Sequence, residues 1–195
     1  MEIRVHACPS CDAPVTPGEK SCKFCKSVYM ISSFSSLSDI DRSKLRNYSN
    51  AYSSGLKDDP DDPSLNHSIG ICYISLGLYD KALASFEKVM DFDPENSFGY
   101  YAAAICLLKG RSAFLNSKKD VDKAIEYLNA ATMIEELGKY HYLMAYLKYD
   151  YYKRKFLRTE PDYSYHLNTA YALGISDEDI FDIFNQLKVN APEGF

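Results

Sequence analysis

The sequence predicts an all-α fold in which a solenoid of short helical hairpins follows a small cysteine-rich segment. First, apolar residues between positions 63 and 96 recur at the spacing of two helices that are separated by a break at Gly77. Second, the same pattern begins again 34 residues further along the chain. Third, the first 30 residues hold four cysteines as two Cys-x-x-Cys pairs. Together these observations predict helical repeats and one separate small module.

The stretch 63–96 resembles a tetratricopeptide repeat, whose pattern is W-x2-L-G-x2-Y, then A-x3-F, then P. The residues at these positions are Asn66, Ile69, Gly70, Tyr73, Ala82, Phe86 and Pro94, and only Asn66, in place of Trp, departs from the pattern. The resemblance implies that the small Gly70 and Ala82 let the two helices approach closely. Tyr73 and Phe86 would fill the gaps between hairpins. The motif is therefore a packing motif, and nothing in it is catalytic.

The composition is that of a globular protein. With 195 residues, of which 46% are hydrophobic, the chain can bury a sizeable core. No apolar run approaches the roughly 18 residues of a membrane span, and the first residues lack the apolar region of an export signal, so we expect a cytoplasmic protein. The net charge of -5 disfavours a general binder of polyanions.

The N-terminal cysteines have the spacing of a metal site. Two Cys-x-x-Cys turns separated by a short connection resemble a zinc ribbon of the rubredoxin-knuckle kind, which we assign to residues 1–30. We predict that a structural Zn²⁺ supplies the folding energy of this module and has no open coordination position. A redox dithiol, a disulfide framework and iron in place of zinc are the alternatives. The four predicted ligands are Cys8, Cys11, Cys22 and Cys25.

Two further cysteines, Cys72 and Cys106, lie alone inside apolar helical segments. Free cysteine packs as a small buried hydrophobe, so we predict that both are core residues. A disulfide between them would not suit a reducing compartment.

Between the ribbon and the repeats, residues 31–38 are rich in serine and read as a linker, although their apolar side chains could instead dock against the helices. A helix that begins at a cap, either Asp39 or Asp41, follows and ends at the sequence DDPDDP. It is predicted to cover the first repeat, because terminal repeats need a cap. The segment 39–190 is thus predicted to be a tetratricopeptide-like α-solenoid with terminal capping helices.

The second hairpin has a degraded motif and about eight extra residues between its two helices. We expect the insertion to lengthen the first helix as far as Leu115 before a polar turn. Asp120 or Asp122 is then predicted to cap the second helix.

The third hairpin is less regular. Residues 140–155 and 163–173 are predicted to be its two helices, with Gly174 as the stop. Ser176 and Asp179 resemble a capping box, so a short amphipathic helix is expected to close the chain.

The sequence offers no catalytic constellation. It contains neither a G-x-S-x-G elbow nor a G-x-x-x-x-G-K-[ST] phosphate loop, and its four histidines are scattered. His141 and His166 could meet across the third hairpin, where we interpret them as structural residues. The prediction is therefore a non-enzymatic scaffold or adaptor.

In the repeat family, the first helices of successive hairpins line a concave face that binds partners. By spacing, the groove residues would be His67, Ile71, Ile74, Tyr101, Ile105, Leu108, Tyr142, Tyr146 and Tyr149. This apolar and aromatic surface would suit a hydrophobic peptide or a partner helix. The alternative is that these side chains only pack against the terminal helix or the zinc ribbon. Three hairpins are near the minimum for a stable stack of repeats. A partner protein or a second copy of the chain could therefore complete the stack.

The alternative function uses the basic cluster at residues 148–158. It contains Lys148, Lys153, Arg154, Lys155 and Arg158, interleaved with aromatic residues. Together with the zinc ribbon, this cluster could contact nucleic acid or another anion, although the acidic net charge counts against it. A solvated helix end is the simpler interpretation.

Overall fold

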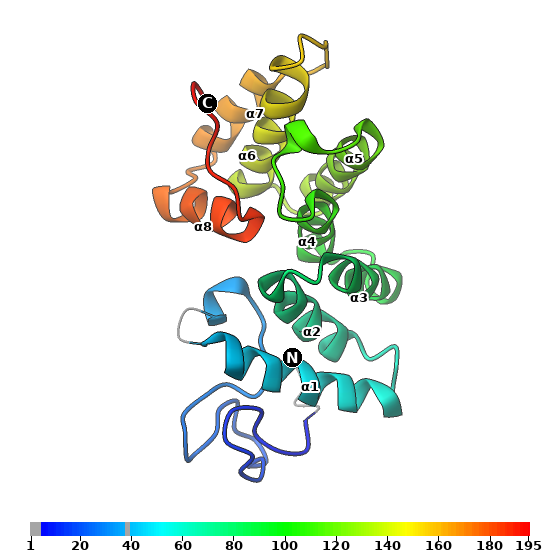
Figure 1. The fold of residues 1–195 in the computed structure, drawn as a ribbon, viewed down its shortest axis with the longest axis vertical. Helices are drawn as coiled ribbons and strands as arrows, with labels where there is room; N and C mark the ends of the chain where they lie inside the picture. The colour runs from blue at the N-terminus through cyan, green and yellow to red at the C-terminus, as the bar shows by residue number, and fades with distance from the viewer. Residues whose placement is uncertain (1–4, 38–39) are drawn as a thin grey trace. The chain divides into compact units, whose positions relative to one another are not determined.

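The computed structural model describes residues 5–37 and 40–195 of the chain (Figure 1). The end of the predicted linker and Asp39 lie outside the described residues. The chain divides into two compact units, Met1–Pro94 and Glu95–Phe195. The boundary falls inside the segment 39–190, whose assignment to one solenoid stays a prediction. The described part of the chain is helical, with strand-like pairing only at two isolated bridges, which confirms the all-α fold class.

The first unit contains the cysteine-rich segment, a short 3₁₀ turn and three helices. The turn is η1 (Phe34–Leu37), and the helices are α1 (Arg42–Asp58), α2 (Pro63–Leu76) and α3 (Tyr79–Phe92). Helix α2 packs against both α1 and α3, so α1 covers the first hairpin as predicted.

Local sequence signals begin and end these helices. The Asp41 carboxylate accepts hydrogen bonds from the backbone N–H groups of Ser43 and Lys44, and it is the cap of α1. Asp62 caps α2 in the same way, with Pro63 at the first helical position, where no N–H partner is needed. Gly77 ends α2 at a φ of 79°, in the left-handed region that glycine adopts without steric cost.

The hairpin of α2 and α3 has the packing that the repeat motif implies. Gly70 is buried, and a Cβ atom built on it would lie 2.7 Å from Cζ of Phe86, whose side chain is itself fully buried. Asn66, which replaces the family's Trp, donates from its side-chain amide to the carbonyls of Pro60 (3.0 Å) and Asp62 (2.9 Å). The departure from the motif therefore ties the preceding turn to α2.

The second unit contains two hairpins and a closing helix. The first hairpin pairs α4 (Ser97–Leu108) with α5 (Lys118–Ile134). The second pairs α6 (Gly138–Leu147) with α7 (Tyr163–Ala172), and α6 continues directly into a π-helix, η3 (Lys148–Lys153). The closing helix α8 (Asp177–Leu187) packs against α6 and α4.

The expectation for the insertion in the second hairpin is wrong. Helix α4 ends at Leu108, and the insertion is a loop with one 3₁₀ turn, η2 (Ala113–Leu115). The side-chain amide of Asn116 donates to the carbonyls of Leu108 and Ser112, which ties this loop to the end of α4. The predicted caps Asp120 and Asp122 are also wrong, since Ser117 is the cap and its Oγ accepts from the backbone N–H of Asp120.

Two further local sequence signals are confirmed. Ser176 and Asp179 form a complete capping box at the start of α8. Cys106, like Cys72 in the first unit, is a buried core residue. Within the part of the chain that the structure describes, none of the helices has the length and apolar character needed to cross a membrane.

Candidate metal centre and partner surface

The four N-terminal cysteines converge on one point. The Sγ atoms of Cys8 and Cys25 lie 3.6 Å apart, as do those of Cys11 and Cys22, and all four sulfurs lie within 4.8 Å of one another. Sulfur ligands at about 2.3 Å from a tetrahedral zinc ion would be separated by about 3.8 Å. The donor set and its spacing therefore fit zinc.

Two equivalent turns hold these sulfurs in place. In the first, the N–H of Cys8 donates to the carbonyl of Ala13, and the N–H of Asp12 donates to the carbonyl of Cys8. Cys22, Lys26 and Ser27 repeat the same pair of bonds in the second turn. Asp12 (φ 60°) and Lys26 (φ 63°), each directly after the second cysteine of its pair, have left-handed backbones. The repeated geometry is that of two knuckles facing each other.

The protonation of the cluster is uneven. Burial raises the pKa of the Cys8 thiol to about 12. Burial also acts to raise the pKa of Cys25, but hydrogen bonds from Ser27 and from the other thiols outweigh it and lower that pKa to about 6. Thiolates this close together repel one another, so a bound cation would stabilise the fully deprotonated set.

Two tyrosines of α1 fasten the ribbon to the helices. The hydroxyl of Tyr48 donates to the carbonyl of Val28 (2.6 Å), and that of Tyr52 donates to the carbonyl of Tyr29 (3.1 Å). Tyr52 also accepts from the N–H of Ile31 (3.0 Å), whose side chain is fully buried. This anchor was not predicted, although two tyrosines four residues apart on one helical face were a sequence signal for it.

The start of the predicted linker is docked through the same contacts. The carbonyl of Ile31 accepts from the hydroxyl of Ser68 (2.8 Å), and Nε2 of His67 lies 3.0 Å from the carbonyl oxygen of Ser32. The segment that follows the ribbon thus lies against α2 as well as α1.

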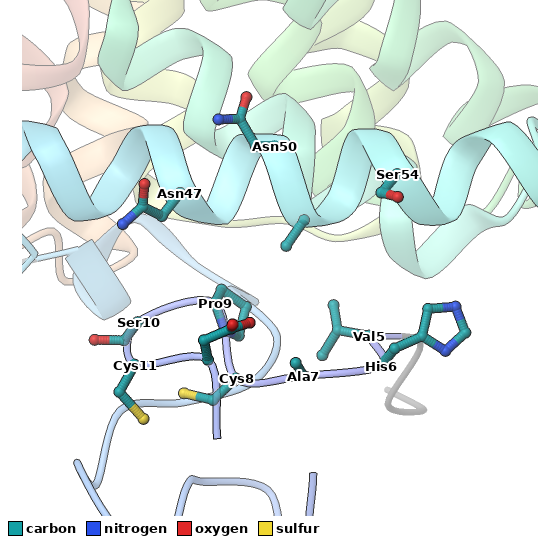
Figure 2. Close-up of a pocket in the computed structure, with 12 residues that line it drawn as sticks. Val5, His6, Ala7, Cys8, Pro9, Ser10, Cys11, Asn47, Asn50 and Ser54 are labelled. Carbon is teal, nitrogen blue, oxygen red and sulfur yellow. The ribbon is translucent and has the colours of Figure 1, made fainter. Parts of the chain in front are cut away.

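Elsewhere the ribbon stands away from α1. A cavity of about 430 Å³ separates residues 5–12, which carry Cys8 and Cys11, from the face of α1 that holds Asn47, Asn50 and Ser54 (Figure 2). The first knuckle is therefore open to solvent on one side, and Cys11 is exposed.

The predicted groove residues are divided between the two units. His67, Ile71 and Ile74 belong to the first unit, where the two isoleucines are fully buried. In this structure these two side chains are part of the core. Their role in a partner groove stays a prediction.

In the second unit, helix α8 contacts three of the predicted groove residues, Tyr101, Tyr142 and Tyr146. The hydroxyl of Tyr101 donates to the side-chain carbonyl of Gln186 in α8 (2.9 Å). The ring of Phe184 lies edge-on to the rings of Tyr142 and Tyr146, with centroids 6.3 and 5.3 Å away. Tyr101, Ile105, Leu108, Tyr142 and Tyr146 are buried, and only Tyr149 is half-buried.

His141 and His166 meet across the third hairpin, with their Nδ1 atoms 3.2 Å apart. Nζ of Lys148 donates to the carbonyl of Pro161 and lies 3.0 Å from Nε2 of His166, so that nitrogen accepts. His166 then donates from Nδ1 to Nδ1 of His141, whose Nε2 faces the Glu136 carboxylate at 3.8 Å. Burial, with the charges of Lys148 and His141, lowers the pKa of His166 to about 4.

Much of the basic cluster is engaged within the unit. Lys148 is buried in the histidine network, and Arg154 forms an ion pair with the buried Asp150. The Lys155 ammonium lies 3.7 Å from the centre of the Tyr151 ring. Lys153 and Arg158 remain exposed, and Phe156 between them is 96% exposed. Two of the five cations are thus presented freely to solvent.

Residues 63–96 match the tetratricopeptide repeat family. The comparison with curated proteins finds no match for the chain. Among solved structures, a double mutant of MamA from strain RS-1 is similar to the chain, with a TM-score of 0.57 and 18% identity over 72% of this chain and 70% of that one. MamA from strain MSR-1 gives a TM-score of 0.53 and 21% identity over 66% and 67% of the two chains. MamA from strain AMB-1 gives a TM-score of 0.53 and 19% identity over 76% of this chain and 85% of that one. At these identities the likeness is one of fold, and the chain is a tetratricopeptide-like assembly of helical hairpins.

Proposed function

We propose that this protein is a non-enzymatic scaffold that binds a protein partner through its helical hairpins. The observation that carries the proposal is the hairpin of α2 and α3, which matches the repeat family and packs through Gly70 and Phe86 as that motif requires. Repeats of this kind present extended surfaces for partner proteins, and their motif residues supply packing. A cytoplasmic location stays a prediction.

The ribbon contributes a structural zinc site to this proposal. Four sulfur ligands would fill a tetrahedral shell, so the metal would have no position for a substrate. Its role would be to fold the two knuckles, since few apolar side chains in this segment are available to form a core. The tyrosine anchor on α1 would then hold the folded ribbon against the first unit.

The alternative function is contact with nucleic acid through the basic cluster. The observation in its favour is the exposed Phe156 between Lys153 and Arg158, since an exposed aromatic ring can stack on a base. Against it stand the internal partners of Lys148, Arg154 and Lys155.

One experiment separates the two functions. The tagged chain is first used to capture a partner protein from its native host, and that partner is purified. The purified partner is then titrated against the chain at about 50 and 200 mM salt. A labelled RNA or DNA is titrated in parallel. Apolar recognition of a protein should depend little on salt, whereas phosphate contacts should weaken steeply.

The discriminating variant is Lys153→Glu combined with Arg158→Glu, which changes the two exposed cations on either side of Phe156 and leaves the ion pair of Arg154 with the buried Asp150 intact. The scaffold function requires that this variant bind the purified partner as the wild type does. Two results together would refute the proposed function in favour of the alternative. The wild type would bind nucleic acid directly and the variant would not, and no purified protein would bind the chain. Variants of Tyr101 or Ile105 are unsuitable here, because both side chains are buried and their loss would destabilise the second unit.

A further inference from the structure

Three tyrosines of the second unit lie on one helical face. Tyr142, Tyr146 and Tyr149 follow one another at spacings of four and three residues, which places them on one face of α6 and its π-helical continuation. Helix α8 covers one side of this face through Phe184. We refer to the three residues as the tyrosine surface.

The residues after α8 return to this surface. Lys188 ends α8 with a left-handed backbone (φ 55°), and the chain closes in a tight turn in which the N–H of Phe195 donates to the carbonyl of Pro192. Gly194 occupies the third position of the turn with a φ of +78°, which is the conformation that a type II turn demands of a glycine. The turn projects the Phe195 ring from the end of the segment.

The Phe195 ring contacts all three tyrosines. Its centroid lies 5.3 Å from that of Tyr142, 6.2 Å from that of Tyr146 and 5.3 Å from that of Tyr149, distances typical of aromatic pairs. The Tyr149 hydroxyl also donates to the carbonyl of Glu193 (2.9 Å). A Cβ atom on Gly194 would lie 3.1 Å from that hydroxyl oxygen, so the surface accepts a glycine before the aromatic residue.

The rest of the segment is held loosely. Asn190, Ala191, Glu193 and Gly194 are exposed. A cavity of about 550 Å³ is lined by α8 residues and by the connecting residues 188–191. Residues 192–195 contact the tyrosine surface through one aromatic ring and one hydrogen bond, which is the arrangement of a bound peptide rather than of a packed helix.

We propose that the tyrosine surface is a peptide-binding site and that residues 192–195 are a ligand for it held within the same chain. The partner segment would be a short turn that presents an aromatic side chain directly after a glycine, and it would displace residues 192–195 when it binds. This inference rests on the proposed function, because it gives the scaffold a site and a ligand chemistry.

The test uses a fluorescein-labelled, C-terminally amidated peptide with the sequence of residues 188–195. It is titrated by fluorescence anisotropy into the wild-type chain and into its Phe195→Ala and Phe181→Ala variants. Phe181 is a matched control because it lies on α8 with its ring 70% exposed. The tethered Phe195 competes at a high effective concentration, so Phe195→Ala should bind the peptide at least about tenfold more tightly than the other two proteins.

Two changes to the peptide test the chemistry. Replacing its phenylalanine with alanine, or its glycine with valine, should abolish binding. Should Phe195→Ala lose its helical circular dichroism signal, Gly194→Val in the full chain releases the same segment, because its side chain would meet the Tyr149 hydroxyl. The site is overturned if the peptide binds Phe195→Ala or Gly194→Val no more tightly than it binds the wild type. It is also overturned if neither of these two variants binds the peptide at about 1 mM.

The two proposals fail separately. Peptide binding by Phe195→Ala, with no partner protein found for the chain, would overturn the proposed function and leave the site. A purified partner that binds the wild type and Phe195→Ala equally, with no binding of the peptide, would overturn the site and leave the scaffold function.

Discussion

A methyl group added to Gly70 tests the central hairpin. The Cβ of Gly70→Ala would lie 2.7 and 2.8 Å from two ring carbons of Phe86 and 3.1 Å from a third. Ordinary contacts between carbon atoms are about 3.5 to 4.0 Å. The Phe86 ring has no exposed surface and lies edge-on to His67 at a centroid distance of 6.2 Å, so it has little room to move aside. The added methyl group must therefore force α2 and α3 apart.

Two opposing effects set the magnitude. Alanine in a helix interior is more favourable than glycine by about 1 kcal/mol, whereas overpacking a well-packed core costs about 1 to 3 kcal/mol. Because three ring atoms lie too close, we place the cost at the upper end and expect a net loss of about 1 to 2 kcal/mol. For a unit of this size, the melting temperature should fall by about 4 to 8 °C per kcal/mol.

The assay is thermal and urea unfolding followed by circular dichroism, on Gly70→Ala, Phe86→Leu and the double variant. Phe86→Leu should destabilise the hairpin by leaving a cavity. The double variant should be more stable than the sum of the two changes predicts, because the smaller leucine makes room for the new methyl group. A Gly70→Ala protein as stable as the wild type, or additive effects in the double variant, would refute this account of the hairpin.

Two further predictions concern the ribbon and the histidine network. The purified chain should carry about one zinc ion, measured by atomic emission. Cys11→Ser should release this zinc with little change in the helical circular dichroism signal, since the helices lie outside the ribbon. A metal-free wild type with four alkylatable thiols in the ribbon would contradict this prediction. The pKa of His166, about 4 in the folded state, lies below its ordinary value, so the unfolded chain takes up this proton first as the pH falls. Stability should be intact above about pH 6.5 and fall by about 1 to 3 kcal/mol toward pH 4. The melting temperature of His166→Asn should depend less on pH over this window, and an identical dependence in both proteins would remove His166 as the cause.

The parts of the fold that the sequence predicted depend on neighbouring residues. Gly70 and Phe86 fall at fixed positions of a repeat whose spacing is set by two helices and a turn. The capping box of Ser176 and Asp179 depends on residues three apart. The convergence of the cysteines likewise follows from two short turns. In each case the interacting groups are close in sequence or belong to a known repeat, so spacing alone is sufficient.

The spacing of residues within α4 and α6 does not determine which segments cover these helices. All residues from Tyr101 to Leu108 in α4 and from Tyr140 to Leu147 in α6 are buried. The Tyr101 hydroxyl finds its partner 85 residues away, at Gln186. The Phe195 ring reaches Tyr149 only because a tight turn at Gly194 returns the chain to the π-helix. Contacts of this range depend on the placement of whole helices, which spacing does not encode.

The tyrosines show how segments outside the repeat pattern are attached. The repeat hairpin itself packs through Gly70, Ala82 and Phe86, which offer no polar side-chain atoms. Four additions to the hairpins lack such a motif, and each is joined by a phenol that packs its ring and bonds a polar group in the added segment. Tyr48 holds the ribbon, Tyr146 accepts from the N–H of Ala113 in the insertion, Tyr101 holds α8, and Tyr149 holds the closing turn. A phenol suits this role because its ring packs against apolar side chains while its hydroxyl can either donate to or accept from a polar group of the added segment. Four of the 17 tyrosines of the chain therefore attach added segments to the helical hairpins.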